Sequence, residues 1–357
     1  MARIVKVVDV PKLHVPIDCT KRNVTRREIA MFKARFISVL IALSFSETGY
    51  SGESLQAPDS AIRVASIGRK VVSKFQNGFL IDSDVADSGL SQIYIYSRTG
   101  AEVMHLKMAI PGALRADVYD FAVSPGGVFA VSGVAFTSDG AYAGYIAWIG
   151  SDGSIQRVVR TNPFGAFRLA FSGDGNLWAA GKVQKPDQTE ESVYDIIRRF
   201  DAEGRLIGSS LPRSSFAIPL NKRNPAANAF LMQLGDGIAF YNPWPREWIQ
   251  LTSSGSVSLR TIAMDAGVFG SAEAVGKIRV TGAAALNSGR VYISAVQPDA
   301  SGKDQPTICR VDPSTSNWQT VDACRVLSSG QHGSIVGADG EDLVIANGTQ
   351  LWWAKVQ

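Results

Sequence analysis

Cysteine and histidine are scarce in this chain, whose 357 residues include three of each. So few cysteines exclude a disulfide-dense mini-protein, and so few histidines leave little material for a multi-histidine metal site. The Gly-x-Ser-x-Gly, His-Glu-x-x-His and Cys-x-x-Cys motifs are absent, as is a complete phosphate-binding loop. We therefore predict no catalytic residue, no metal site and no cofactor.

The net positive charge of the chain comes from its N-terminal end. The whole sequence has 36 basic and 32 acidic side chains, a net charge of +4. The first 35 residues hold about nine of the basic and three of the acidic groups, so the remainder is slightly acidic. Such a body offers little attraction to a phosphate backbone, and we expect no nucleic-acid partner.

Long apolar runs are missing apart from one short segment near the N-terminus. Lys33 and Arg35 precede the uncharged run 36–46, which ends in small and polar residues. This layout is typical of a secretory signal and too short for a stable membrane span, although a buried amphipathic helix is the alternative. We predict an upstream extension at 1–30, a signal peptide at 31–46, a linker at 47–59 and a domain at 60–357 of an exported protein (periplasmic or extracellular).

Helix signals are also scarce after residue 60, where short apolar segments alternate with turns that contain glycine. One phrase, an apolar strand followed by a glycine turn and a second apolar strand, occurs six times in the chain. Its turn glycines are Gly78, Gly127, Gly175, Gly237, Gly289 and Gly340. A second turn follows most of these phrases, so each repeat of about 50 residues contains four strands.

The repeat predicts an all-β fold, a six-bladed β-propeller with four-stranded antiparallel blades. The last repeat stops after Leu351–Val356 without a fourth strand, whereas the segment Ala61–Ile67 precedes the first repeat without a partner. We therefore expect this N-terminal strand to close the last blade, which would leave no open sheet edge between the chain ends. We expect a monomer.

Two cysteines flank a predicted hairpin in the fifth repeat. A hairpin centred on residues 313–316 pairs Cys309 with Thr320 and leaves Cys324 four residues beyond the register. A disulfide would then need a bulge or bend, because distant Cα atoms cannot be bridged. We favour two free thiols and keep the disulfide as the alternative.

The phrases FAVSPGGVFAVSG (121–133) and LAFSGDGNLWAAG (169–181) resemble six-bladed propellers of the NHL and YVTN/SMP-30-like type. The Asp-x-x-x-x-Arg run of NHL repeats is missing from most units. Lactonase-like propellers of similar fold hold a divalent cation through Glu, Asn and Asp, so the resemblance implies a metal-dependent hydrolase as an alternative function. Its candidate ligands here are Asp117, Asp120, Asp265, Glu273, Asn221, Asn224 and Asn228.

Basic residues occupy many of the segments that connect one repeat to the next. In a propeller these connections share one rim, where guanidinium groups can bind a carboxylate or phosphate. We predict a ligand-binding site of Arg69, Arg115, Arg168, Arg213 and His332, and Lys74 is among the basic residues that lead into the first repeat. The predicted function is a non-catalytic binding module for an anionic small molecule or a protein partner.

A Pro-stiffened loop around Trp244 supports a further alternative. An exposed indole on a rigid loop can stack on a sugar or a peptide. A cell-surface carbohydrate-binding or adhesion protein is therefore a third hypothesis, although Trp244 could equally pack between blades.

Overall fold

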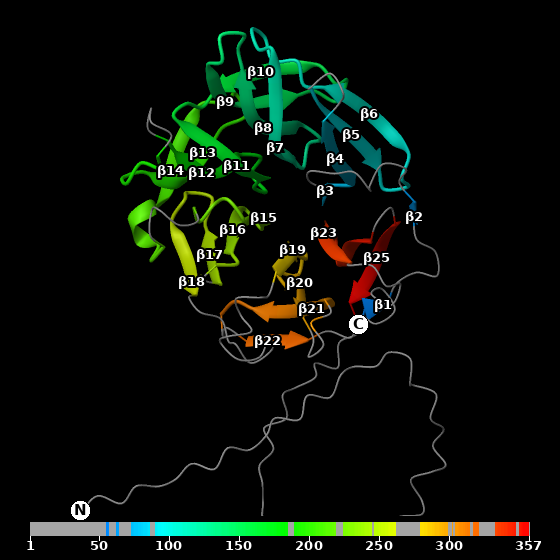
Figure 1. Cartoon of the computed structure of the whole chain (residues 1–357). Helices are drawn as coiled ribbons and strands as arrows, with labels where there is room; N and C mark the ends of the chain where they lie inside the picture. The colour runs from blue at the N-terminus through cyan, green and yellow to red at the C-terminus, as the bar shows by residue number, and fades with distance from the viewer. Residues whose placement is uncertain are drawn as a thin grey trace, which may run out of the picture. The chain divides into compact units, whose positions relative to one another are not determined.

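The computed structural model of this protein describes about two-thirds of the chain (Figure 1). The described residues are 55–56, 62–63, 73–85, 90–184, 189–218, 224–244, 246–261, 279–298, 302, 304–314, 317–320, 333–347 and 350–356. They form 25 strands, one short 3-10 helix at Arg213–Ser215 and no α-helix. Nowhere in these ranges is there a helix with the length and apolar character that a membrane crossing needs.

Four sheets each consist of four consecutive antiparallel strands. One sheet contains β7 (Arg115–Val123), β8 (Phe129–Phe136), β9 (Tyr142–Ile149) and β10 (Ile155–Arg160). The next contains β11 (Phe164–Phe171), β12 (Leu177–Val183), β13 (Asp195–Phe200) and β14 (Leu206–Pro212). A third contains β15 (Phe230–Leu234), β16 (Gly237–Asn242), β17 (Glu247–Leu251) and β18 (Val257–Thr261). The fourth contains β19 (Arg279–Ala285), β20 (Val291–Pro298), β21 (Asp304–Asp312) and β22 (Asn317–Thr320).

The remaining strands form one nine-stranded sheet that includes both ends of the domain. Its first part contains β3 (Ser73–Gln76), β4 (Phe79–Val85), β5 (Ser91–Ser97) and β6 (Glu102–Lys107). Its second part contains β23 (Ser334–Asp339), β24 (Asp342–Asn347) and β25 (Gln350–Val356). The two parts meet at a single parallel pair, Gly337 with Phe75.

Two short N-terminal strands lie along β25. In β2 (Ile62–Arg63), Ile62 pairs antiparallel with Leu351, and in β1 (Leu55–Gln56), Leu55 pairs with Val356. The strand β2 lies inside the predicted segment Ala61–Ile67, whereas β1 lies inside the predicted linker 47–59. The rest of the linker, the predicted signal peptide and the residues before it lie outside the described residues.

The turn glycines explain why the chain reverses where it does. Gly78, Gly127, Gly175, Gly289 and Gly340 all adopt positive φ, which a side chain makes costly. In the third sheet the prediction of Gly237 is wrong, because Gly235 takes the positive φ of that turn. Gly237 instead begins β16, where a Cβ atom would lie 2.0 Å from the carbonyl oxygen of Leu251.

The apolar core is divided into layers between neighbouring sheets. Ala122 and Ala130 of one sheet, for example, pack with Leu169 and Leu177 of the next. Both faces of most sheets are covered in this way, which explains why inner strands are rich in alanine, valine and aromatics. Figure 1 shows these sheets arranged side by side around a common centre, with the first strand of each sheet innermost.

The fifth repeat forms the predicted hairpin register. Cys309 pairs with Thr320, and the Cys309 thiol is free and fully buried. Burial raises the pKa of this thiol to about 12, so it stays protonated at neutral pH. Cys324 lies outside the described residues.

A central cavity as candidate binding site

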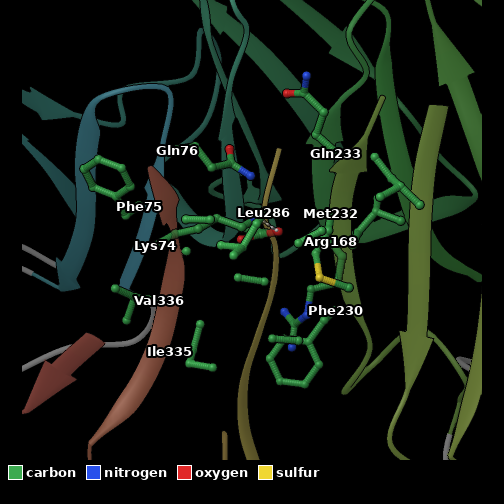
Figure 2. A pocket seen from close by; sticks show the side chains of 18 of the residues that line it. Lys74, Phe75, Gln76, Arg168, Phe230, Met232, Gln233, Leu286, Ile335 and Val336 are labelled. Carbon is green, nitrogen blue, oxygen red and sulfur yellow. Dashed lines mark hydrogen bonds and ion pairs between the residues drawn. The ribbon is translucent and has the colours of Figure 1, made fainter. Parts of the chain in front are cut away.

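The innermost strands surround a cavity of about 1360 Å³. Its lining comes from the first strand of every repeat, namely β3, β7, β11, β15, β19 and β23. Figure 2 shows side chains from several of these strands pointing toward the same space. The cavity is larger than a typical site for a small organic ligand.

Lys74 and Asp120 form an ion pair in the cavity wall. The Lys74 ammonium donates to Asp120 Oδ2 at 2.9 Å and to the carbonyl oxygens of Phe121 and Leu169 at 3.0 and 2.9 Å. The same carboxylate oxygen accepts the main-chain N–H of Leu169 at 2.7 Å. One lysine and one aspartate therefore connect β3, β7 and β11.

The surroundings of Lys74 decide what its amine can do. Burial lowers the pKa of Lys74, although Asp120 beside it opposes this shift. A lysine with a lowered pKa can serve as a nucleophile or base when its amine is free. Here all three ammonium hydrogens have an acceptor, so the group holds the strands together rather than facing a reactant.

Arg168, on β11, lines the cavity beside this ion pair. Its guanidinium donates to the carbonyl oxygens of Ala229 at 2.7 Å, Ala227 at 2.9 Å and Phe167 at 2.9 Å. These neutral acceptors fix the plane of the group without cancelling its charge. Among the described residues, no carboxylate forms an ion pair with Arg168.

The strands β19 and β23 supply a mostly apolar wall, which also includes Arg279 and Thr281. Val280, Ala283, Ala285, Val336 and Ala338 line the cavity and are partly buried. Their side chains are small, which leaves the centre open. The run of alanines in β19 is the signal in the sequence that could have predicted this wall, and our sequence analysis missed it.

Trp244 stands at the edge of the cavity, in the turn between β16 and β17. Its side chain is 51% exposed, and its main-chain N–H donates to the side chain of Asn242, which stiffens the turn. The prediction that Trp244 is available for stacking is therefore compatible with its position. The structure does not place it between sheets.

Two of the predicted arginines lie away from the cavity. Arg115 is exposed at the start of β7, where it pairs with Asp117 at 2.5 Å and lies over the ring of Phe136. Arg213 is buried and pairs with Glu190 at 2.7 Å. Neither side chain lines the cavity, so Arg168 is the described member of the predicted set that does.

Arg213 belongs to a polar cluster that fixes a long connection. Glu190 accepts hydrogen bonds from Arg213, Tyr194 and Asn224, and Arg213 also donates to the carbonyl oxygen of Ile218. Burial, together with Glu190, raises the pKa of Tyr194. Arg213 therefore stabilises this connection, and its buried guanidinium is not accessible to a ligand.

The remaining predicted ligand residues, Arg69 and His332, lie outside the described residues, as do Asp265 and Glu273. Within the described ranges, no group of three or more His, Cys, Asp or Glu side chains could hold a metal ion. Asp120 is the described carboxylate in the cavity lining, and it is already bound to Lys74.

Comparison with known proteins supports the fold. No protein-family model matches the sequence, and no curated protein matches it. A solved structure of a Bacteroides fragilis protein assigned as exported is similar, with a TM-score of 0.52 and 11% identity over 85% of this chain and 95% of that one. A streptogramin B lyase has a TM-score of 0.44 at 12% identity, over 85% of this chain and 98% of that one. These are propeller-type folds. This chain has a β-propeller-like fold, and the NHL/YVTN resemblance remains a prediction.

Proposed function

We propose that this protein is an exported six-bladed β-propeller whose central cavity binds an anionic small molecule without catalysing a reaction. The observation that carries the proposal is the position of Arg168, whose charged group lines the cavity with no described carboxylate paired to it. Separate observations support each part of this proposal: the six-bladed ring, the anionic ligand, binding without catalysis, and export.

Contacts between successive inner strands support a ring of six blades. Lys74 connects β3 to β7, Asp120 connects β7 to β11, and Arg168 connects β11 to the segment before β15. Apolar side chains of β15 and β19 share a core layer, and Ile335 of β23 donates to Ser294 of the preceding sheet. The pair Gly337–Phe75 returns to β3. In this proposal β2 and β1 are the outer strand of the last blade.

Charge supports an anionic ligand. The Lys74–Asp120 pair is neutral as a unit, whereas Arg168 keeps its positive charge against three carbonyl dipoles. A partly enclosed site strengthens the attraction between such a cation and an anion, because less water screens it. A carboxylate is well matched to the remaining guanidinium donors.

The hydrogen bonds that Lys74 and Asp120 already make within the protein support binding without catalysis. A general base or nucleophile must present a free lone pair to the substrate. Lys74 has its three hydrogens engaged, and one oxygen of Asp120 accepts from both Lys74 and Leu169. The metal-dependent hydrolase alternative gains no support from the described lining.

Export is supported by the N-terminal sequence. Lys33 and Arg35 precede an uncharged apolar run that ends in small and polar residues, which is the pattern of a secretory signal. The protein that reaches the periplasm or medium would then begin close to residue 47.

A titration with benzoate tests the anion site. We expect calorimetry to show binding of benzoate to the wild type and at least about tenfold weaker binding to Arg168→Gln, because a charge-assisted hydrogen bond is lost. Arg115→Gln is the matched control, since Arg115 is exposed and outside the cavity. Its affinity for benzoate should equal that of the wild type.

The uncharged analogue completes this test. Benzyl alcohol has the same ring without the carboxylate, so it should bind more weakly than benzoate and should not respond to Arg168→Gln. Equal binding of benzoate and benzyl alcohol, or an equal loss of benzoate binding in Arg115→Gln, would contradict an anion site at Arg168.

A further inference from the structure

The cavity has two chemically different sides. Its charged groups Lys74, Asp120 and Arg168 come from β3, β7 and β11, which follow one another around the centre. The apolar wall of β19 and β23 lies across the cavity from β7 and β11, as the arrangement in Figure 1 shows. A molecule that fills the cavity from one side to the other therefore meets a cation at one end and aliphatic side chains at the other.

The donors of Arg168 limit the kind of head group. A guanidinium has five N–H donors, and here three of them, one on each nitrogen, are held by main-chain carbonyl oxygens. Two donors remain, one on each terminal nitrogen. Two donors match the two oxygens of a carboxylate, whereas a phosphate group presents three acceptor oxygens.

The charge of the cavity also limits the kind of head group, because it favours a single negative charge. Asp120 neutralises Lys74, so the pair contributes no net charge beside Arg168. Arg279 also lines the cavity, but it is exposed at the start of β19. One fixed positive charge at the polar side suits a singly charged anion better than a dianion, whose second charge would lose its hydration without a partner.

The apolar wall offers aliphatic side chains against which a hydrocarbon body can pack. Ala283 and Ala285 line the cavity with only a methyl group each, and they also pack against the core layer that includes Met232. Val336 and Ala338 of β23 continue this surface. Figure 2 shows Val336, Leu286 and Met232 around the same space as Arg168. When a hydrocarbon chain covers this wall, both surfaces are removed from water, and the free energy gained is proportional to the apolar area buried.

We infer that the ligand is an amphiphilic monocarboxylate, with its carboxylate on Arg168 and its apolar body against β19 and β23. This inference rests on the proposed function and adds the substrate class. The head group sets the orientation, and the apolar body provides most of the affinity.

A chain-length series tests this inference on the unmodified protein. Acetate, hexanoate and decanoate share one head group, so differences in their dissociation constants report the apolar wall alone. We expect calorimetry to show affinity rising about fourfold for each methylene that reaches the wall, and decanoate to bind at least 100-fold more tightly than acetate. Decanol should bind at least tenfold more weakly than decanoate.

Variants localise the two ends of the ligand. Ala283→Phe puts a bulky ring at the apolar wall, so it should weaken decanoate at least tenfold and leave acetate unchanged. Arg168→Gln should weaken both acids, and Arg168→Lys, which keeps the charge, should restore part of the loss. Thermal unfolding of each variant shows whether it is folded, and Arg205→Gln, at an exposed pair outside the cavity, is the control.

The outcomes separate this inference from the proposed function. If acetate and decanoate bind equally and both depend on Arg168, the amphiphilic ligand is overturned and the anion site stands. If decanoate and decanol bind equally and Arg168→Gln changes neither, the anion site is overturned as well. If no acid of the series binds, the inference is overturned, and the benzoate titration decides the proposed function separately.

Discussion

Lys74 shows how a single side chain connects three sheets. Its ammonium contacts a carboxylate and two carbonyl oxygens that lie 46 to 95 residues away in the sequence. Each acceptor comes from an inner strand, so the contacts fix the distance between neighbouring sheets at the centre. The side chain is 18% exposed, which leaves most of the ion pair shielded from solvent.

Replacing this lysine should destabilise the fold. We expect Lys74→Met to lower the free energy of unfolding by about 3 kcal/mol, because the buried Asp120 carboxylate would lose its cation. Denaturant unfolding followed by tryptophan fluorescence measures the change. Arg205→Met, which breaks the exposed Arg205–Asp201 pair, should have little effect on the same measurement. Equal losses in the two variants would contradict a structural role of Lys74.

The arginines show what sequence reasoning could predict at this scale. The sequence predicted Arg168 among the basic residues of the connections on the rim, whereas in the structure it lies on the inner strand β11 and lines the cavity. The environment of Arg213 depends on Glu190, which lies 23 residues away in a long connection with no repeat pattern. Charge pairing of that kind depends on the path of the loop, and the sequence alone does not specify that path.

At the scale of elements, the inner strands approach one another closely through glycine. A Cβ on Gly337 would lie 2.0 Å from the carbonyl oxygen of Phe75, and one on Gly282 would lie 1.9 Å from that of Ile335. Both glycines stand beside a shift in strand register. The three strands β19, β23 and β3 therefore depend on two residues that lack a side chain.

A pair of glycine substitutions separates close approach from turn conformation. Gly337→Ala should lower the free energy of unfolding by about 3 kcal/mol or more, since neighbouring backbone must move to admit the methyl group. Gly78→Ala, where the added atom meets open space but φ is +85°, should cost only about 1–2 kcal/mol. Thermal and denaturant unfolding give both values. A smaller loss for Gly337→Ala than for Gly78→Ala would show that β23 and β3 are not in close contact.

The same distinction explains where the hairpin prediction succeeded and where it was wrong. A tight turn requires glycine for a local reason, because one of its residues has a positive φ. The repeat in the sequence therefore identified the glycine of five of the six turns. The segment Leu234–Gly237 contains two glycines with different roles. Gly235 takes the positive φ of the turn, and Gly237 allows the close approach of a neighbouring strand. The sequence alone does not show which glycine has which role. The role of Gly237 depends on Leu251, a residue on the next strand.

For the whole molecule, the pairing of the first and last segments is the central point. In the proposed closure, β2 completes the sheet of β25, and the inner strands form a ring around the cavity through the pair of Gly337 with Phe75. An unpaired edge at β25 would leave main-chain donors and acceptors exposed and invite association with other chains. The composition of the cavity, and therefore every proposal about its ligand, depends on this closure.

A cross-link between Ile62 and Leu351 tests the closure most directly. These residues are antiparallel partners, so cysteines at both positions have Cα atoms close enough for a disulfide. Cys19 and Cys324 would be replaced by alanine, whereas the buried Cys309 thiol can stay because its raised pKa keeps it protonated. The matched control is Ile62→Cys with Lys355→Cys. Lys355 lies on β25 like Leu351, but four residues away from the partner of Ile62.

We predict that Ile62→Cys with Leu351→Cys forms an intramolecular disulfide in the native protein under mild oxidation, and that oxidation raises the Tm because it closes a long loop. The control pair should remain reduced under the same conditions. If the Ile62–Leu351 pair fails to cross-link, or cross-links no faster than the control, the ends of the domain do not join in this register and the closed cavity is contradicted.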